Sequence, residues 1–347
     1  TVLLDGPKGP VERARATETE LRARMAKPGR QLYCALFRAL TDELLEECFA
    51  SDWSCARVDT FVQQRYLWEV EDIFRAFYRP FLSTYKKLSS VGLDRGGAKF
   101  GVSQAAAVGF LKKVGLCDGR TTKVSDVIRL FLACKVLPLD MREEQEEDGE
   151  AEILEDSQAP TLERHQFLGL FVRIAEQRFV GAGRAATVPE ALPYVMEALA
   201  DYGDSLVDYE QELFAELHTQ AVHDVFARHA DKLTVTYQKF SGRFTPPGTP
   251  MYMTVAEFVD VMQASHAHDS EFTADKAGWA FRLGMMTQKD EVSSDRCHEM
   301  SFLEFQHAVG AAASLRAGYA PAVLPELLDD FLSMNIVRAI PPRGKGR

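Results

Sequence analysis

The chain of 347 residues carries a formal net charge of −11, with 46% hydrophobic and 26% charged residues. At about 100–200 residues per domain this length favours two domains, and the composition excludes collagen-like, coiled-coil and wholly disordered chains. No apolar run reaches the about 18 residues of a membrane span, and residues 1–16 lack the apolar core of a signal peptide. The six cysteines show no Cys-x-x-Cys spacing, which is typical of reduced thiols. We therefore expect a cytoplasmic protein without a membrane span.

The charge is distributed unevenly along the chain. Residues 143–156 hold nine acidic residues and no Lys or Arg, and without them the net charge is −2. Such a run predicts a solvated loop, because like charges repel and no apolar stripe supports an ordered element. Both ends are basic: residues 1–30 have seven Lys or Arg against four acidic residues, and residues 338–347 have four against none. We expect extended basic arms that bind an acidic partner surface.

Apolar residues recur at three- and four-residue steps along most of the chain, which predicts amphipathic helices. The expected helices cover residues 31–50, 57–79, 163–178 and 206–229. Pro80 is expected to end the second of them. A last amphipathic helix has Pro325 in its first turn. It is expected to dock into its own lobe or into a neighbour's. No sustained period-two alternation competes, so the predicted fold class is all-α, with strands limited to short pairings between loops.

Phenylalanines on the expected helices recur in two similar series, 36, 21 and 36 residues apart and then 32, 23 and 24 residues apart. The two series are Phe74, Phe110, Phe131 and Phe167, and Phe226, Phe258, Phe281 and Phe305. The largest mismatch is 12 residues, and it falls where the acidic run is inserted. Duplicated units of this size indicate two similar helical lobes.

Two stretches, Met253-Thr-Val-Ala-Glu-Phe258 and Met300-Ser-Phe-Leu-Glu-Phe305, resemble the second half of an EF-hand. In that motif an apolar residue pairs with the sister loop, a Ser or Thr caps the exiting helix, and Glu-Phe follows. The segments that start at Val225 and Leu88 look like shortened further units. Over residues 57–335 the chain resembles a two-lobed, degenerate EF-hand protein, similar in layout to EF-hand-like proteins of ciliary axonemes and to the tubulin-polymerisation-promoting family.

The expected organisation follows from these patterns. An extended N-terminal arm and an N-terminal helical segment precede two EF-hand-like lobes, and a basic arm ends the chain. The expected ranges are 1–30 and 31–56 for the arm and the segment, 57–200 with the acidic insertion 143–156 and 201–335 for the two lobes, and 336–347 for the C-terminal arm.

The loops of these units lack most calcium ligands. A calcium loop needs oxygen ligands at positions 1, 3, 5, 7, 9 and 12 and a glycine at position 6. With Glu257 at position 12, Pro246, Gly248 and Pro250 fall at positions 1, 3 and 5 and offer no side-chain ligand. With Gln166 at position 12, a proline stands where the glycine belongs, and the unit near Phe226 is too short. We expect no calcium in these three loops.

Only the last loop keeps a set of side-chain oxygens, from Asp295, Glu299, Ser301 and Glu304. Ser293 and His298 stand at positions 1 and 6, where a carboxylate and a glycine are usual. One weak calcium site at most is therefore expected, no other cofactor is predicted, and the units are interpreted as packing modules.

Other motifs point to loops rather than to chemistry. Residues 181–186 match a dinucleotide-binding Gly-x-Gly-x-x-Ala pattern, but they follow a helix and not a strand, which predicts a helix C-terminal loop. The cluster His266-Ala-His268-Asp269 has no second ligand pair at zinc spacing and predicts a polar loop between helices. No motif for nucleophilic or phosphoryl chemistry is present, and a pI of about 5.3 without a basic aromatic helix argues against nucleic-acid binding.

We therefore expect a non-enzymatic structural protein of a large cytoskeletal assembly, and the resemblance implies a ciliary or flagellar axoneme with tubulin as a partner. The acidic surface of microtubules would attract basic arms in a salt-sensitive way. The partner-binding candidates are Arg338, Arg343, Lys345 and Arg347. Two alternatives remain open: a calcium-responsive regulator that binds a partner helix, and a helical subunit of another large complex.

Overall fold

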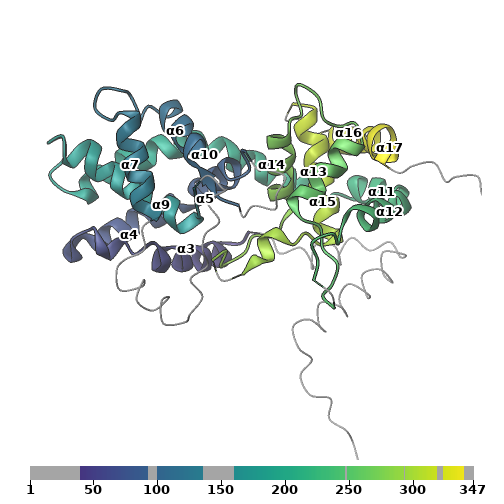
Figure 1. The fold of residues 1–347 in the computed structure, drawn as a ribbon, viewed down its shortest axis with the longest axis horizontal. Helices are drawn as coiled ribbons and strands as arrows, with labels where there is room; N and C mark the ends of the chain where they lie inside the picture. Colours follow the sequence, from purple (N-terminus) through teal and green to yellow (C-terminus); the bar gives the residue numbers. More distant parts are fainter. Residues whose placement is uncertain are drawn as a thin grey trace, which may run out of the picture. The chain divides into compact units, whose positions relative to one another are not determined.

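The computed structural model describes residues 40–92, 100–135, 160–246, 248–292, 294–318 and 323–339. Within these ranges the regular structure is helical apart from two strands of two residues each and one isolated bridge (Figure 1). The predicted all-α class is confirmed. The predicted N-terminal arm and the acidic insertion 143–156 lie outside the described residues, as do Arg343, Lys345 and Arg347 of the predicted C-terminal arm.

The chain divides into two compact units whose boundaries differ from the expected ones. We call residues 40–211 together with 287–297 the N-terminal unit, and residues 212–286 together with the chain from 298 onward the C-terminal unit. The helix within the expected segment 31–56 is not separate, because Leu44, Cys48 and Phe49 are buried in the same core as the rest of the N-terminal unit.

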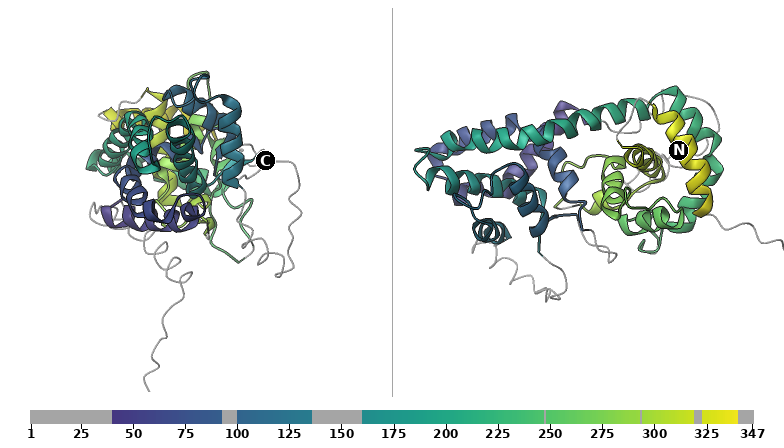
Figure 2. Two further views of the ribbon diagram at one scale, coloured as in Figure 1. Left: turned by 90° about the vertical axis from the view of Figure 1, so that its left-hand side faces the viewer. Right: turned by 90° about the horizontal axis from the view of Figure 1, so that it is seen from above.

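The N-terminal unit is a helical assembly in which two helix–loop–helix elements meet through a short sheet. Its helices are α3 (Asp42–Ala56), α4 (Leu67–Ala76), α5 (Tyr78–Leu88), α6 (Gln104–Lys113), α7 (Val124–Lys135), α9 (Arg164–Ala175) and the larger part of α10 (Val188–Leu217). Figure 2 shows α10 as a long helix, coloured teal to green. Strands β1 (Val102–Ser103) and β2 (Thr161–Leu162) pair antiparallel, with Val102 opposite Leu162.

The C-terminal unit repeats this arrangement with a single bridge in place of the sheet. Its helices are α11 (Gln220–Arg228), α12 (Ala230–Phe240), α13 (Val255–Ala264), α14 (Ala274–Gly284), α15 (Phe302–Arg316), α16 (Leu324–Phe331) and α17 (Val337–Ala339), with a π-helical turn between the last two. Met253 and Met300 exchange both backbone hydrogen bonds at 2.9 Å. The pairing that the sequence predicted for these two methionines is therefore confirmed.

Three expected helices end elsewhere, and a local cause is visible in each. Pro80 does not end a helix: α4 ends at Ala76, and Pro80 lies in the first turn of α5, where a missing N–H costs no intrahelical bond. The expected helix 31–50 does not run through Thr41, because α3 begins after this residue, whose hydroxyl accepts the Leu44 N–H. The expected helix 206–229 is broken at Thr219, which caps α11 in the same way.

The helix that starts near Pro325 docks into its own unit, which is one of the two possibilities left open by the sequence. Helix α16 packs on α15 and α11, and its apolar face is buried. The expected C-terminal arm begins later than residue 336, because Ile336 is buried and the Lys239 ammonium donates to the carbonyl of Ala339 at 2.6 Å. Arg338, the one predicted arm residue in the described part, is exposed on α17.

The two units share a repeated plan at the level of single residues. Helices α4 and α5 meet at Phe77 with φ −104° and ψ 11°, and α11 and α12 meet at His229 with φ −103° and ψ 10°. Tyr85 on α5 and Tyr237 on α12 hold equivalent places, and each hydroxyl donates to a carbonyl of the following loop at 3.3 Å. The two units therefore share this local geometry at equivalent positions.

The turn between the two helix–loop–helix elements is also built alike in both units. Asp118 accepts backbone N–H groups at the start of the turn before α7, and Arg178 pairs with it at 3.1 Å. Asp269 does the same before α14, with Arg316 at 3.1 Å. The Thr121 hydroxyl and then the backbone N–H groups lower the pKa of Asp118, and the backbone N–H groups lower the pKa of Asp269. Neither Asp–Arg pair was predicted from the sequence, although the two pairs occupy matching places in the two units.

One member of the predicted phenylalanine repeat is out of register. In three helix–loop–helix elements, a Phe lies five residues after the residue that pairs across the sheet or bridge. Phe258 follows Met253 in this way, and Phe305 follows Met300. After Val102 that place is taken by Ala107, and Phe110 lies one helical turn further along the same face of α6. The spacing alone could not separate these neighbours, because both are buried.

Candidate functional site

The two loops of the C-terminal unit are each closed by a buried glutamate. Glu257 and Glu304 are fully buried, and each forms a capping box with the residue that begins its helix. The Oε2 atom of Glu304 accepts the N–H and the hydroxyl of Ser301 at 2.8 and 2.7 Å. The Oε2 atom of Glu257 accepts the same two groups of Thr254 at 2.7 and 3.0 Å.

The second oxygen of each glutamate holds the far side of its own loop. Glu304 Oε1 accepts the N–H of Met286 at 3.0 Å, and Glu257 Oε1 accepts the N–H of Arg243 at 2.7 Å. Both carboxylates therefore bridge the end of the loop to a backbone group that precedes it by 18 or 14 residues. Backbone N–H groups occupy the oxygens that a position-12 glutamate presents to calcium.

The four predicted metal-ligand candidates have separate surroundings. Ser301 and Glu304 lie together as cap and acceptor. Asp295 is exposed in a short 3-10 turn of the N-terminal unit, and Glu299 is half-buried in the C-terminal unit. In the described ranges, no group of three or more His, Cys, Asp or Glu side chains is placed to hold a metal ion. Metal binding by this set remains a prediction.

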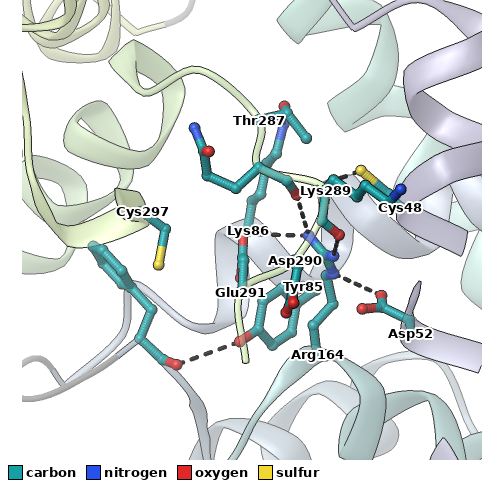
Figure 3. A network of polar contacts seen from close by, with 12 residues as sticks. Cys48, Asp52, Tyr85, Lys86, Arg164, Thr287, Lys289, Asp290, Glu291 and Cys297 are labelled. Carbon is teal, nitrogen blue, oxygen red and sulfur yellow. Dashed lines mark hydrogen bonds and ion pairs between the residues drawn. The ribbon is translucent and has the colours of Figure 1, made fainter. Parts of the chain in front are cut away.

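A buried arginine organises the polar interior of the N-terminal unit (Figure 3). The first residue of α9, Arg164, is 1% exposed. Its Nε donates to Asp52 Oδ2 at 2.6 Å, and the same oxygen accepts the hydroxyl of Tyr78 at 2.6 Å. Burial raises the pKa of Asp52, and the arginine and the tyrosine oppose that shift. Burial also opposes the charge of Arg164, but the nearby acidic groups prevail and raise its pKa, so the guanidinium stays charged.

The remaining donors of Arg164 point to residues 287–297, which belong to the N-terminal unit (Figure 3). Nη1 lies 3.2 Å from the carbonyl of Gln288 and 3.3 Å from the Glu291 carboxylate, and Nη2 lies 2.8 Å from the carbonyl of Lys289. Cys48 donates its thiol to the carbonyl of Gln288 at 3.4 Å. Burial raises the pKa of this thiol to about 11, so it remains a protonated donor.

The Gly-x-Gly-x-x-Ala stretch and the His266–Asp269 cluster both lie in loops, as predicted. Residues 181–186 form the turn that follows α9 and its π-helical extension, with Gly183 at φ +67°. His266 and His268 lie in the loop between α13 and α14.

None of the helices in the described residues is long and apolar enough to cross a membrane.

Comparison of the chain with protein-family models, with curated proteins and with solved structures finds no match.

Proposed function

We propose that the chain is a non-enzymatic helical scaffold built from two degenerate EF-hand pairs. The duplicated helix–loop–helix plan, the bridge between Met253 and Met300 and the capping boxes at Thr254 and Ser301 support the EF-hand assignment. The assignment extends to the N-terminal unit through the equivalent pairing of Val102 with Leu162.

The observation that carries this proposal is that both glutamates aligned with position 12 accept backbone hydrogen bonds. Glu257 and Glu304 are buried acceptors of backbone N–H groups on both sides of their loops. A metal ion could bind either carboxylate only if these charge-assisted hydrogen bonds broke. The loops therefore act as fixed packing elements, and a scaffold fits them better than the calcium-responsive regulator does.

Calcium titration of the full chain by calorimetry is expected to show at most one weak site. Three loops lack ligands, and the carboxylate of the fourth is already bonded. The melting temperature should be the same in calcium and in a chelator. Two or more sites tighter than about micromolar, which is the range of calcium sensors, would instead establish the regulator.

We further propose that the scaffold belongs to a cytoskeletal assembly, with ciliary or flagellar microtubules as its acidic surface and tubulin as a partner. The basic composition of residues 1–30 and 338–347 supports this proposal. Arg338 is the described member of the C-terminal set, and its exposure leaves it free to reach a surface beyond its own unit. A helical subunit of another large complex would share these features but not the preference for microtubules.

Replacing Arg338, Arg343, Lys345 and Arg347 together by Ser should weaken co-sedimentation with microtubules, and the loss of affinity should be largest at low salt, because salt screens exposed charges. Each exposed contact contributes only about 0.2–1 kcal/mol, so the effect comes from their number. The matched control replaces four exposed basic residues of the N-terminal unit by Ser: Lys112, Arg120, Lys123 and Arg184. Equal loss in both variants would indicate a net-charge effect and would remove the arm as the anchor.

A further inference from the structure

Residues 287–297 are a separate element of the N-terminal unit. Residues 212–286 before them and the chain after them belong to the C-terminal unit, and the segment itself joins α14 to α15. Its described residues, 287–292 and 294–297, include no α-helix or strand, and the 3-10 turn Asp295–His298 begins within it. Its internal hydrogen bonds are short-range, such as that from the N–H of Val292 to Asp290, so its order depends largely on contacts with other parts of the N-terminal unit.

Those contacts use donors of the unit and oxygens of the segment. The Arg164 guanidinium reaches two consecutive carbonyls and the Glu291 carboxylate, within 2.8–3.3 Å. The Lys86 ammonium donates to the hydroxyl of Thr287 at 3.3 Å, and the Cys48 thiol adds a third donor. Two of these donors are cationic, and the segment presents only oxygen atoms to them (Figure 3).

The arginine has no counterpart in the duplicated unit. The first residue of α15, Phe302, stands at the place that Arg164 holds on α9, and its ring packs on Tyr237 with centroids 5.4 Å apart. An apolar residue therefore satisfies the fold at this position. Burying a charge instead is costly unless each of its donors is satisfied, and the segment supplies three of the four acceptors of Arg164.

We propose that the Arg164 pocket is an intramolecular peptide-binding site, and that residues 287–297 form a latch that occupies it. The Arg164 guanidinium contacts the backbone carbonyls of two consecutive residues and the carboxylate of a residue two positions further on. The site thus selects a stretch of chain that offers two consecutive carbonyls and then a carboxylate, and it fixes the loop before α15 with a side-chain cation. The latch is independent of the scaffolding function, because its test measures the protection of the segment itself.

Hydrogen exchange of the full chain tests the latch. The variant Arg164→Met with Asp52→Asn removes both buried charges and keeps an acceptor for the hydroxyl of Tyr78. Peptides that cover residues 287–297 should exchange roughly tenfold faster or more, because several charge-assisted bonds are lost. Peptides from α5 and α9 should keep their protection. Trypsin should then cut after Lys289 faster than it cuts the unaltered chain there, because the backbone on either side is released.

Two further variants make each result decisive. Glu291→Gln alters only the half-buried latch residue and should accelerate exchange of the segment several-fold. Arg178→Met removes an arginine of the same unit that contacts Asp118 instead, and it should leave the segment protected. Unchanged exchange of the segment in both latch variants would overturn the proposal. Equal acceleration throughout the N-terminal unit would overturn it as well, since the segment would then not be separately released.

Discussion

Replacing Glu304 by Ala is expected to lower the free energy of unfolding of the C-terminal unit by about 3 kcal/mol. The substitution removes a helix cap worth about 0.5–2 kcal/mol. It also removes the charged acceptor of the half-buried N–H of Met286 on the other side of the loop, and a hydrogen bond to a charged group is worth about 1.5–3 kcal/mol. Chemical denaturation followed by circular dichroism measures the change. The exposed Glu326→Ala on α16 is the control and should stay within about 0.5 kcal/mol.

The response to calcium separates this closure from metal binding. If Glu304 closes the loop through backbone bonds, Glu304→Ala loses the same stability in a chelator as in calcium. If Glu304 is a ligand in the folded protein, the loss should appear only with calcium present, because a ligand stabilises only the state that binds it. Glu257→Ala should behave as Glu304→Ala does, since its carboxylate closes the preceding loop with the same contacts.

The local features of the fold could be predicted because neighbouring residues determine them. Thr254 and Ser301 cap their helices as expected, because the hydroxyl and the glutamate three residues later are both encoded within one turn. The pairing of Met253 with Met300 followed from the same local pattern, once it recurred. Helix ends were less predictable, as Pro80 shows: the periodicity continues across the junction at Phe77.

The Arg164 pocket could not be predicted, because its partners are distant in the sequence. Glu163, Arg164 and His165 together are typical of an exposed helix start, and charged residues are seldom fully buried. The acceptors of the arginine lie 112 residues before it, in Asp52, and 124 residues after it, in Gln288. Only the three-dimensional structure brings these groups together. Comparison with Phe302 at the equivalent position then marks the arginine as an addition to the duplicated plan.

A buried and a half-buried histidine should make the C-terminal unit sensitive to acid. The rings of His218 and His307 meet edge to face, with centroids 5.1 Å apart. His218 Nδ1 lies 2.7 Å from the carbonyl of Phe214, so this nitrogen must carry the proton of the neutral ring. Burial lowers the pKa of both side chains, and for His307 the neighbouring His218 lowers it further. Both rings are therefore neutral in the folded unit at pH 7.

The sign of the pH dependence follows from these lowered values. The unfolded chain takes up protons on both rings below pH 6.5, the ordinary value, while the folded unit does not. Stability is therefore complete above pH 6.5 and is lost as the pH falls below it, until the folded rings take up their own protons at lower pH. The loss attributable to His307 should be the larger of the two, because full burial lowers the pKa of this ring well below its ordinary value.

His307→Gln should flatten this dependence, whatever it does to stability at neutral pH. We expect the difference in the free energy of unfolding between pH 7.5 and pH 5 to shrink, because the group that resists protonation in the fold is gone. The control His223→Gln lies on α11, where the side chain is only half-buried, and it should retain the full dependence. An unaltered difference in the His307 variant would mean that the folded unit accommodates a charged ring at this position. The contact with His218, which disfavours a second positive charge, makes that outcome inconsistent with the structure.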